Sequence, residues 1–420
     1  MKPTSVFQTV SVIGLGYVGL PTAATIATRG INVIGVDIDE AAVKTINTGG
    51  SHIVETDLDV VLQAAVVSGK LKAATRPEPA DAFVIAVPTP ITPDKRSDLR
   101  AVEAAFRSIA PVLAKGNLVI LESTSPVGTT ERMAKLLAEL RPDLTFPHDA
   151  PEASDVLMSY CPERILPGHT LRELVDNSRT VGGLDSASAE KTLEFYRIFC
   201  RGELHLTSSR AAELVKLAEN SFRDVNIAFA NELSMLCADL DIDVHEVITA
   251  ANRHPRVTIL QPGPGVGGHC IPVDPWFIVE AQPEKARLIR TAREVNDNKT
   301  LFVIDQIKAR AERFKHPTIA AFGLAYKPDV DDLRESPAVE IVERLAHDRV
   351  GDILVVEPNI DVLPPSLAAL ANVRLVSLKE AVAKADILAV LVGHAAFKKL
   401  PSTTITEKVV IDTIGLWRKS

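Results

Sequence analysis

The sequence predicts an α/β protein with two doubly wound parallel-sheet domains joined by a long central helix. Over about the first 200 residues, short runs rich in β-branched residues alternate with amphipathic stretches, which is the pattern of βαβ units. From residue 208 onward more than 30 residues pass without proline or glycine, and after Lys315 the alternation returns. We therefore expect three parts, at residues 1–205, 206–312 and 313–420.

The first domain should contain four strands in order, at the apolar runs of residues 9–14, 31–39, 81–90 and 117–128. The amphipathic segments that separate them, residues 20–30 and 100–116, are expected to be helices. Glycine and proline in two further stretches, residues 158–168 and 180–183, then mark an edge that carries a site.

One long helix is expected over residues 208–243, where seven apolar residues recur at helical spacing: Leu214, Leu217, Phe222, Val225, Phe229, Leu233 and Leu236. Its length exceeds that of an ordinary globular helix, so it should connect domains or form a subunit interface. A second long helix is expected at residues 288–314. The strands of the second sheet should follow at residues 318–328, 352–358, 385–393 and 408–415.

The composition is that of an ordinary globular protein, with 46% hydrophobic residues, 24% charged residues and a net charge of −8. No cluster of basic residues indicates a nucleic-acid partner, and no apolar run approaches the roughly 20 residues of a membrane span. The N-terminal segment lacks the features of a signal peptide, so a cytoplasmic location is expected. The four cysteines lie far apart, which argues against a zinc site and against a disulfide framework.

A dinucleotide-binding motif follows the first expected strand. Gly14, Gly16 and Gly19 form GxGxxG, a helix-like segment comes next, and the second strand ends at Asp37. Such glycines let the backbone approach a pyrophosphate, and the helix N-terminus favours its negative charge. The Asp37 carboxylate can accept hydrogen bonds from ribose hydroxyls and would repel a 2′-phosphate. The first domain is therefore expected to be Rossmann-like and to bind NAD rather than NADP.

Three threonines stand at the expected carboxyl edge of this sheet. Thr89 follows the third strand, and Thr124 and Thr130 follow the fourth. Ligands of open α/β sheets bind along that edge, so all three are candidates for contacts with cofactor or substrate. Their hydroxyls could instead serve only to close their own turns.

The long helix carries Lys216, Asn220 and Arg223 at spacings that place them on one face. A lysine and an amide together can stabilise an oxyanion. The alternative is that these polar residues form an ordinary solvated face.

The loop QPGPGVGGHCIPVDP, residues 261–275, contains a cysteine among glycines and prolines. A thiolate at Cys270 would be a good nucleophile toward an aldehyde, and a nearby ammonium would lower its pKa. Asp274 could activate water or orient Lys216, and His269 could be a general base or a structural residue. Together with the NAD motif, these residues predict an enzyme that oxidises an alcohol twice, through an aldehyde trapped on the thiol.

Seven motifs in the same order resemble the UDP-glucose/GDP-mannose dehydrogenase family over nearly the whole chain: GLGYVGLP, ESTSPVGTT, CPERILPG, ELVKLAENSFRDVNIAFANE, NRHPRV, PGPGVGGHCIPVDP and FGLAYKPDVDDLRESP. The resemblance implies NAD-dependent, four-electron oxidation of a nucleotide sugar through a thiohemiacetal and a thioester. Within the family, CPERILPG, NRHPRV and the Trp-Phe pair after the cysteine loop favour UDP-N-acetyl-D-mannosamine, oxidised at C6 for bacterial surface polysaccharides.

The resemblance also assigns roles. Cys270 would be the nucleophile, Lys216 and Asn220 would stabilise oxyanions, Asp274 would assist proton transfer, and Thr124 is placed in the same catalytic group. The expected NAD contacts are Gly14, Gly16, Tyr17, Val18, Gly19, Asp37, Thr89 and Thr130, with Arg334 reaching an NAD of a partner chain. The expected sugar-nucleotide contacts are Arg164, Ile165, Lys216, Asn220, Arg223, His254, Arg256 and Gly267, with Tyr326 and Lys327 holding the UDP. A homodimer through the long helix would share these sites, and no metal is expected.

One departure from the family pattern concerns water activation. Glu163 matches the residue that serves as hydrolysis base, but Arg164 follows it, and Pro167 stands where a second glutamate is usual.

Other nucleotide sugars (UDP-N-acetylglucosamine, UDP-glucose, GDP-mannose) stay possible substrates. A two-electron β-hydroxyacid-type dehydrogenase and a non-enzymatic nucleotide-binding protein are the alternatives from other classes. The second sheet lacks GxGxxG, which suits UDP better than a dinucleotide.

Overall fold

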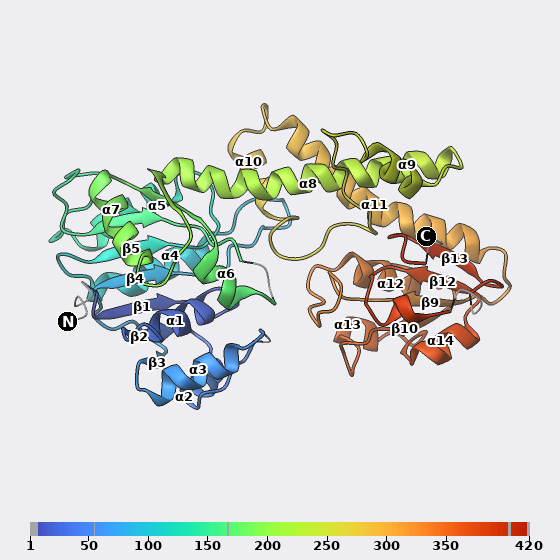
Figure 1. Cartoon of the computed structure of the whole chain (residues 1–420), viewed down its shortest axis with the longest axis horizontal. Helices are drawn as coiled ribbons and strands as arrows, with labels where there is room; N and C mark the ends of the chain where they lie inside the picture. Colours follow the sequence, from blue (N-terminus) through green and yellow to red (C-terminus); the bar gives the residue numbers. More distant parts are fainter. Residues whose placement is uncertain (1–6, 54, 166–167, 402–404, 418–420) are drawn as a thin grey trace. The chain divides into compact units, whose positions relative to one another are not determined.

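The structure, a computed structural model, describes residues 7–53, 55–165, 168–401 and 405–417. The chain divides into two compact units, an N-terminal unit of residues 1–219 and a C-terminal unit of residues 220–420. Helix α8, Ser209–Asp239, is the long yellow-green helix of Figure 1 and contains the boundary between them. The three-part division expected from the sequence stays a prediction. The fold class is confirmed, because one α/β domain with a mainly parallel sheet precedes the long helices in the sequence and another follows them.

The sheet of the N-terminal unit has the strand order β3-β2-β1-β4-β5-β6-β7-β8. Neighbouring strands are parallel except β6 and β7, which pair antiparallel. The order from β3 to β6 is that of a dinucleotide-binding fold, with its switch point between β1 and β4. The strands are β1 (Thr9–Ile13), β2 (Asn32–Val36), β3 (Leu71–Ala74), β4 (Ala82–Ile85), β5 (Leu118–Leu121), β6 (Leu157–Tyr160), β7 (Arg179–Gly183) and β8 (Leu204–Ser208).

Helices cover both faces of this sheet, which explains why β4 and β5 are buried along their whole length. One core lies between the sheet and side chains of α1, α3 and α7, and a second lies against α4 and α5. The helices are α1 (Gly19–Ala27), α2 (Glu40–Asn47), α3 (Leu58–Val67), α4 (Arg100–Ile109), the 3-10 turn η1 (Ala110–Val112), α5 (Thr129–Leu140), α6 (Thr170–Asp176) and α7 (Ser186–Tyr196).

Two long helices of the chain were predicted well, within a few residues at each end. α8 covers Ser209–Asp239, and α11 covers Arg287–Ala311. In the C-terminal unit they are joined by buried polar groups, because Asp224 accepts hydrogen bonds from Arg293 at 2.6 Å and from Asn296 at 2.8 Å. The shorter helices between them are α9 (Val244–Ala251) and α10 (Asp274–Ala281).

The sheet of the C-terminal unit is entirely parallel, with the order β11-β10-β9-β12-β13. Its four predicted strands are confirmed, whereas the short edge strand β11 was missed. The elements are β9 (Thr318–Phe322), α12 (Pro337–His347), β10 (Asp352–Val356), α13 (Pro365–Ala368), β11 (Val373–Leu375), α14 (Leu378–Lys384), β12 (Ile387–Val390), the 3-10 turn η2 (Phe397–Lys399) and β13 (Val409–Asp412). Cores form on both faces of this sheet too.

Candidate active site

The turn between β1 and α1 requires glycine at two positions for different reasons. Gly14 has φ of +92°, and a Cβ there would lie 2.5 Å from the carbonyl oxygen of Ala86. A Cβ on Gly19 would lie 1.8 Å from the carbonyl oxygen of Gly14, so the first turn of α1 packs directly on the loop. Around Gly16 the corresponding position has no atom within 4 Å. The middle of the turn is therefore open to a ligand while its two ends are closely packed.

Asp37 is held in place next to this turn. Its Oδ2 accepts a hydrogen bond from the Leu15 amide at 2.8 Å, and its Oδ1 accepts one from the Asp39 amide at 3.0 Å. Tyr17 and Val18, in the turn itself, are partly buried. An open glycine turn at a helix N-terminus with a fixed carboxylate beside it fits the pyrophosphate and ribose of a dinucleotide.

The three threonines lie in different surroundings at the carboxyl edge of the sheet. The hydroxyl of Thr89 donates to the carbonyl oxygen of Thr124 at 2.7 Å, which joins the loops after β4 and β5. Thr130 is fully buried, and both its amide and its hydroxyl donate to the carboxylate of Glu213, at 2.9 and 2.7 Å. Glu213, from α8, thus accepts hydrogen bonds from backbone amides at the start of α5 that have no acceptor within that helix. Burial raises the pKa of Glu213, against the effect of those hydrogen bonds.

Glu163 is the meeting point of the second group of predicted residues. Lys216 Nζ donates to the backbone carbonyl oxygen of Glu163 at 2.8 Å. The Glu163 side chain is buried, with Oε2 2.5 Å from the guanidinium of Arg179 and Oε1 2.7 Å from the amide of Arg164. Two residues predicted to be catalytic, 53 positions apart in the sequence, are thus in direct contact.

Arg164 extends this group along α8 and β7. Its guanidinium forms an ion pair with Glu219 at 2.6 Å and donates to the hydroxyl of Thr180 at 2.9 Å. Ile165, the next residue, is partly buried. Pro167, where the family pattern has a second carboxylate, lies outside the described residues.

The cysteine loop ends in a turn that leads into α10. Cys270 is exposed, and its backbone carbonyl oxygen accepts hydrogen bonds from the amides of Val273 and Asp274 at 3.1 and 2.9 Å. Asp274 is buried, and its Oδ2 accepts a hydrogen bond from Asn220 Nδ2 at 2.5 Å. The structure therefore brings together Asn220, whose amide is predicted to stabilise oxyanions, and Asp274, which is predicted to assist proton transfer. Asp274 lies four residues after Cys270 in the chain.

Glycines place the same loop against the second sheet's first turn. A Cβ on Gly267 would lie 2.6 Å from the carbonyl oxygen of Glu335, and one on Gly268 would lie 3.1 Å from the Tyr326 ring. Lys327 Nζ lies 5.7 Å from the centre of that ring. Gly267, Tyr326 and Lys327, all predicted to hold the sugar nucleotide, are thus neighbours.

The remaining predicted residues lie at the surface. Arg223 on α8, and His254 and Arg256 after α9, are exposed. Arg334 pairs with Asp332 at 2.8 Å and is about half exposed, its side chain at 53%. Desolvation lowers the pKa of His269, and the positive charge of Arg334 lowers it further.

Sequence reasoning missed the residues that surround Glu163 and Thr130. Glu213 lies one turn before Lys216 on α8, and Glu122 and Arg179 are charged residues at the ends of apolar strands. A carboxylate directly after a buried strand, as in LVILE, is the same signal that identified Asp37. It could have identified Glu122, but no local pattern shows that Arg179 meets it.

Two other kinds of feature are absent from the described residues. Nowhere among them are three or more His, Cys, Asp or Glu side chains grouped so that they could hold a metal ion. In the same part of the chain, every helix is too short or too polar to cross a lipid bilayer.

Comparison with known families covers both units. The models of the UDP-glucose/GDP-mannose dehydrogenase family match its NAD binding domain to residues 8–200, its central domain to residues 210–298 and its UDP binding domain to residues 320–419. The chain belongs to the UDP-glucose/GDP-mannose dehydrogenase family. As a member of this family it is an NAD-dependent oxidoreductase, and the glycine turn with Asp37 is the part of the chain that fits this cofactor.

Two similar relatives within the family carry different names. An NDP-N-acetyl-D-galactosaminuronic acid dehydrogenase of Ralstonia nicotianae is 58% identical over 411 residues, which are 98% of this chain and 96% of the relative. A UDP-N-acetyl-D-mannosamine dehydrogenase of Escherichia coli K12 is 58% identical over 420 residues, which are 98% of this chain and 100% of the relative.

Solved structures of the family agree with this fold. The UDP-N-acetyl-mannosamine dehydrogenase of Staphylococcus aureus matches with a TM-score of 0.87 and 40% identity, over 98% of this chain and 96% of the other. A UDP-glucose dehydrogenase from Pyrobaculum islandicum matches with a TM-score of 0.85 and 28% identity, over 99% and 96% of the two chains.

Proposed function

We propose that this enzyme oxidises the C6 hydroxyl of UDP-N-acetyl-D-mannosamine to a carboxylate in two successive two-electron steps. The product, UDP-N-acetyl-D-mannosaminuronate, would serve the synthesis of bacterial surface polysaccharides in the cytoplasm. The observation that carries the proposal is the exposed residue Cys270 at the turn that leads into α10. A dehydrogenase that stops at an aldehyde needs no nucleophile, whereas oxidation to an acid needs a group that holds the aldehyde.

The thiol accounts for the second oxidation. Loss of a hydride from C6 and of the hydroxyl proton gives an aldehyde, and the Cys270 thiolate adds to its carbon while the oxygen takes a proton. Loss of a second hydride and of that proton converts the thiohemiacetal to a thioester. Water then adds to the thioester, the C–S bond breaks and the thiolate is regenerated. When bound, NAD supplies the hydride acceptor of each oxidation.

Charged and amide groups support these steps. Lys216 and Asn220, one helical turn apart on α8, would stabilise the oxyanions that form on the sugar carbon. Asp274 fixes the orientation of the Asn220 amide through their hydrogen bond. Glu163 is proposed as the base that activates water. Thr124, in the loop after β5 at the same edge of the sheet, is proposed to belong to the same catalytic group.

The nucleotide would be held by the C-terminal unit. Tyr326 and Lys327 stand in the loop after β9, next to Gly267 of the cysteine loop. Lys327 supplies a positive charge suited to a pyrophosphate, and the tyrosine ring supplies a flat apolar surface. Arg164, Ile165, Arg223, His254 and Arg256 are proposed for the sugar side of the substrate.

The choice of sugar is the finer part of the proposal. The motifs favour N-acetylmannosamine, and one relative at 58% identity is named for that substrate, while another at 58% is named for an N-acetylgalactosaminuronic acid. A panel of UDP-linked N-acetylmannosamine, N-acetylgalactosamine, N-acetylglucosamine and glucose, together with GDP-mannose, decides between them. We expect the highest kcat/KM for UDP-N-acetylmannosamine, and a preference for the galacto sugar would move the assignment to the second candidate.

The experiment that tests the chemistry counts NADH per sugar oxidised. We expect two NADH for the unmodified enzyme. The Cys270→Ala variant should bind NAD and substrate normally but release no uronic acid, which mass spectrometry of the products measures. One NADH per sugar, with an aldehyde as final product, would contradict the proposal.

We also propose that the enzyme is a homodimer formed through α8. Phe222, Phe229 and Leu236, which are 71%, 55% and 53% exposed, repeat every seven residues and so form one apolar stripe. A second copy of the same helix offers the matching stripe. We expect a dimer in analytical ultracentrifugation and a monomer for Phe222→Glu/Phe229→Glu. An unmodified enzyme that sediments as a monomer would contradict this.

A further inference from the structure

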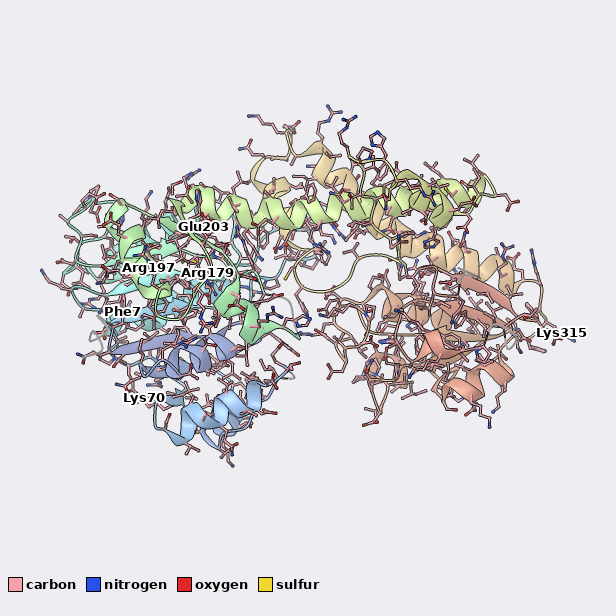
Figure 2. The ribbon with its side chains drawn as sticks, in the orientation of Figure 1. Phe7, Lys70, Arg179, Arg197, Glu203 and Lys315 are labelled. Carbon is pink, nitrogen blue, oxygen red and sulfur yellow. The ribbon has the colours of Figure 1, made fainter. Side chains whose placement is uncertain are left out.

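A buried cluster of charges lies behind Glu163 in the N-terminal unit. Arg179, the first residue of β7, has a side chain that is 2% exposed and reaches Glu163 at 2.5 Å and Glu122 at 3.5 Å. Figure 2 labels Arg179 within that unit. The Glu122 side chain is fully buried. None of these contacts takes part in the NAD turn or in the cysteine loop.

The antiparallel pair of strands explains how Arg179 comes to lie there. Glu122 follows β5 and Glu163 follows β6, so both lie at the carboxyl edge of the sheet. Because β7 runs in the opposite direction, its first residue lies at that same edge. Ser159 pairs with Gly183 and Tyr160 with Gly182, and continuing this register past the end of β6 brings Glu163 opposite Arg179.

Two aromatic rings and a backbone carbonyl also contact the Arg179 guanidinium. Its carbon lies 4.6 Å from the centre of the Tyr196 ring and 5.7 Å from that of Phe199. One of its nitrogens also donates to the carbonyl oxygen of Leu174 at 3.3 Å. Stacking on aromatic rings desolvates the guanidinium and fixes its plane.

The charges of the cluster balance around Glu163. Burial raises the pKa of Glu122 to about 8, helped by the negative charge of Glu163 and opposed by Arg179. The raised pKa favours the neutral form of Glu122, which also accepts a hydrogen bond from the Tyr196 hydroxyl at 3.1 Å. That leaves the positive charge of Arg179 to compensate the Glu163 carboxylate.

Stability alone does not account for such a cluster. The desolvation cost of a buried ion pair is of the same size as its attraction, and apolar replacements are often neutral or stabilising. Arg179 instead fixes one oxygen of Glu163 while the Arg164 amide fixes the other. A carboxylate has about four acceptor sites, so these two contacts leave acceptor capacity on both oxygens.

We propose that Arg179 is a positioning residue that holds and charge-compensates the Glu163 carboxylate for hydrolysis of the thioester on Cys270. This rests on the proposed function of Glu163 as the hydrolysis base. A second acidic side chain does accompany Glu163 in space, but it is that of Glu122, which follows another strand and is linked to Glu163 through Arg179.

The test separates the oxidation steps from thioester hydrolysis. Pre-steady-state release of NADH measures the oxidations, and intact-mass spectrometry of the quenched enzyme measures the acyl group on Cys270. For Arg179→Met we expect a kcat about 100-fold lower, a burst of NADH and an accumulated acyl-enzyme, as for Glu163→Gln. Arg179→Lys, which keeps the charge, should recover part of the rate and is the variant to use if Arg179→Met does not fold.

Two comparisons make the result specific. The double variant Glu163→Gln/Arg179→Met should be no more than about twofold slower than Glu163→Gln, because both substitutions remove the same function. Arg293→Met removes another buried arginine, 1% exposed and paired with Asp224, and should lower Tm without any accumulation of acyl-enzyme.

Three results would overturn the proposal. A lower kcat in Arg179→Met without acyl-enzyme would mean a purely structural role, and so would losses that multiply in the double variant. If Glu163→Gln itself accumulates no acyl-enzyme, Glu163 is not the base and Arg179 has nothing to position. Failure of the proposed function is recognised separately, by an unmodified enzyme that releases only one NADH per sugar.

Discussion

Lys216 Nζ donates a hydrogen bond to the backbone carbonyl oxygen of Glu163, at 2.8 Å. The contact joins the second turn of α8 to the loop that follows β6, within the N-terminal unit. It fixes the position of an ammonium group next to the residue proposed to activate water. Glu163 is thus held at its backbone by Lys216 and at its carboxylate by Arg179 and the Arg164 amide.

Replacement of Lys216 should therefore impair catalysis more than binding. For Lys216→Met we expect a kcat about 10²- to 10³-fold lower with a KM changed much less, because the ammonium acts on developing negative charge. Steady-state kinetics with NAD and the preferred UDP-sugar measure both. Lys135→Met, at an exposed position on α5, is the matched control and should behave like the unmodified enzyme. An unchanged kcat in Lys216→Met would remove the lysine from the mechanism.

Asn220 and Asp274 should act as one unit. Their hydrogen bond at 2.5 Å orients the amide, so loss of either residue removes the same function. We expect Asn220→Ala and Asp274→Ala each to lower kcat/KM about 100-fold, and the double variant to lose little more. A double-mutant cycle on kcat/KM then gives a coupling of about 2–3 kcal/mol. Independent, multiplying losses would show that the contact has no part in the reaction.

Asp37 should decide the affinity for NAD. A hydrogen bond to a charged group contributes about 1.5–3 kcal/mol, so Asp37→Ala should raise the Kd of NAD about 10- to 100-fold and reduce discrimination against NADP. Titration calorimetry with both cofactors measures this. Asp39→Ala is the control, because Asp39 caps α2 through the amides of Ala41 and Ala42. It should lower Tm and leave the Kd of NAD unchanged, and equal effects of the two variants on Kd would contradict the assignment.

Lys299 should make the stability of the C-terminal unit depend on pH. The side chain is buried between α8 and α11, donates to the Ser234 hydroxyl at 2.7 Å, and has a pKa lowered by burial to about 8. An unfolded lysine keeps its proton up to about pH 10.4, so between about pH 8 and 10.4 the unfolded state binds more protons. The free energy of unfolding therefore rises with pH in this window, by about 3 kcal/mol in total.

The variant Lys299→Met should abolish that rise and be the more stable protein at pH 7. Urea unfolding at a series of pH values, followed for the C-terminal transition, provides the measurement. Lys285→Met, at an exposed position before α11, serves as control and should retain the rise. The prediction is wrong if Lys299→Met and the unmodified protein show the same dependence on pH.

Much of the site was predictable because its signals are local. The glycine turn, Asp37 and the cysteine loop each lie in one continuous stretch, next to a strand or helix whose period is visible in the sequence. Lys216 and Asn220 were predictable for the same reason, since helical spacing alone places them one turn apart. The family motifs then indicated which chemistry these residues serve, because seven of them occur in order.

Local patterns were enough for the fold class, both long helices and the NAD turn, because backbone periodicity and glycine geometry act over a few residues. Only the tertiary structure decided which buried groups meet. Arg179 lies 16 residues from Glu163 and 57 from Glu122, and strand order together with the reversed direction of β7 brings the three to one edge. Charges that pair across a sheet leave no periodic trace in the sequence, because their contact depends on the packing of strands that are distant in the chain.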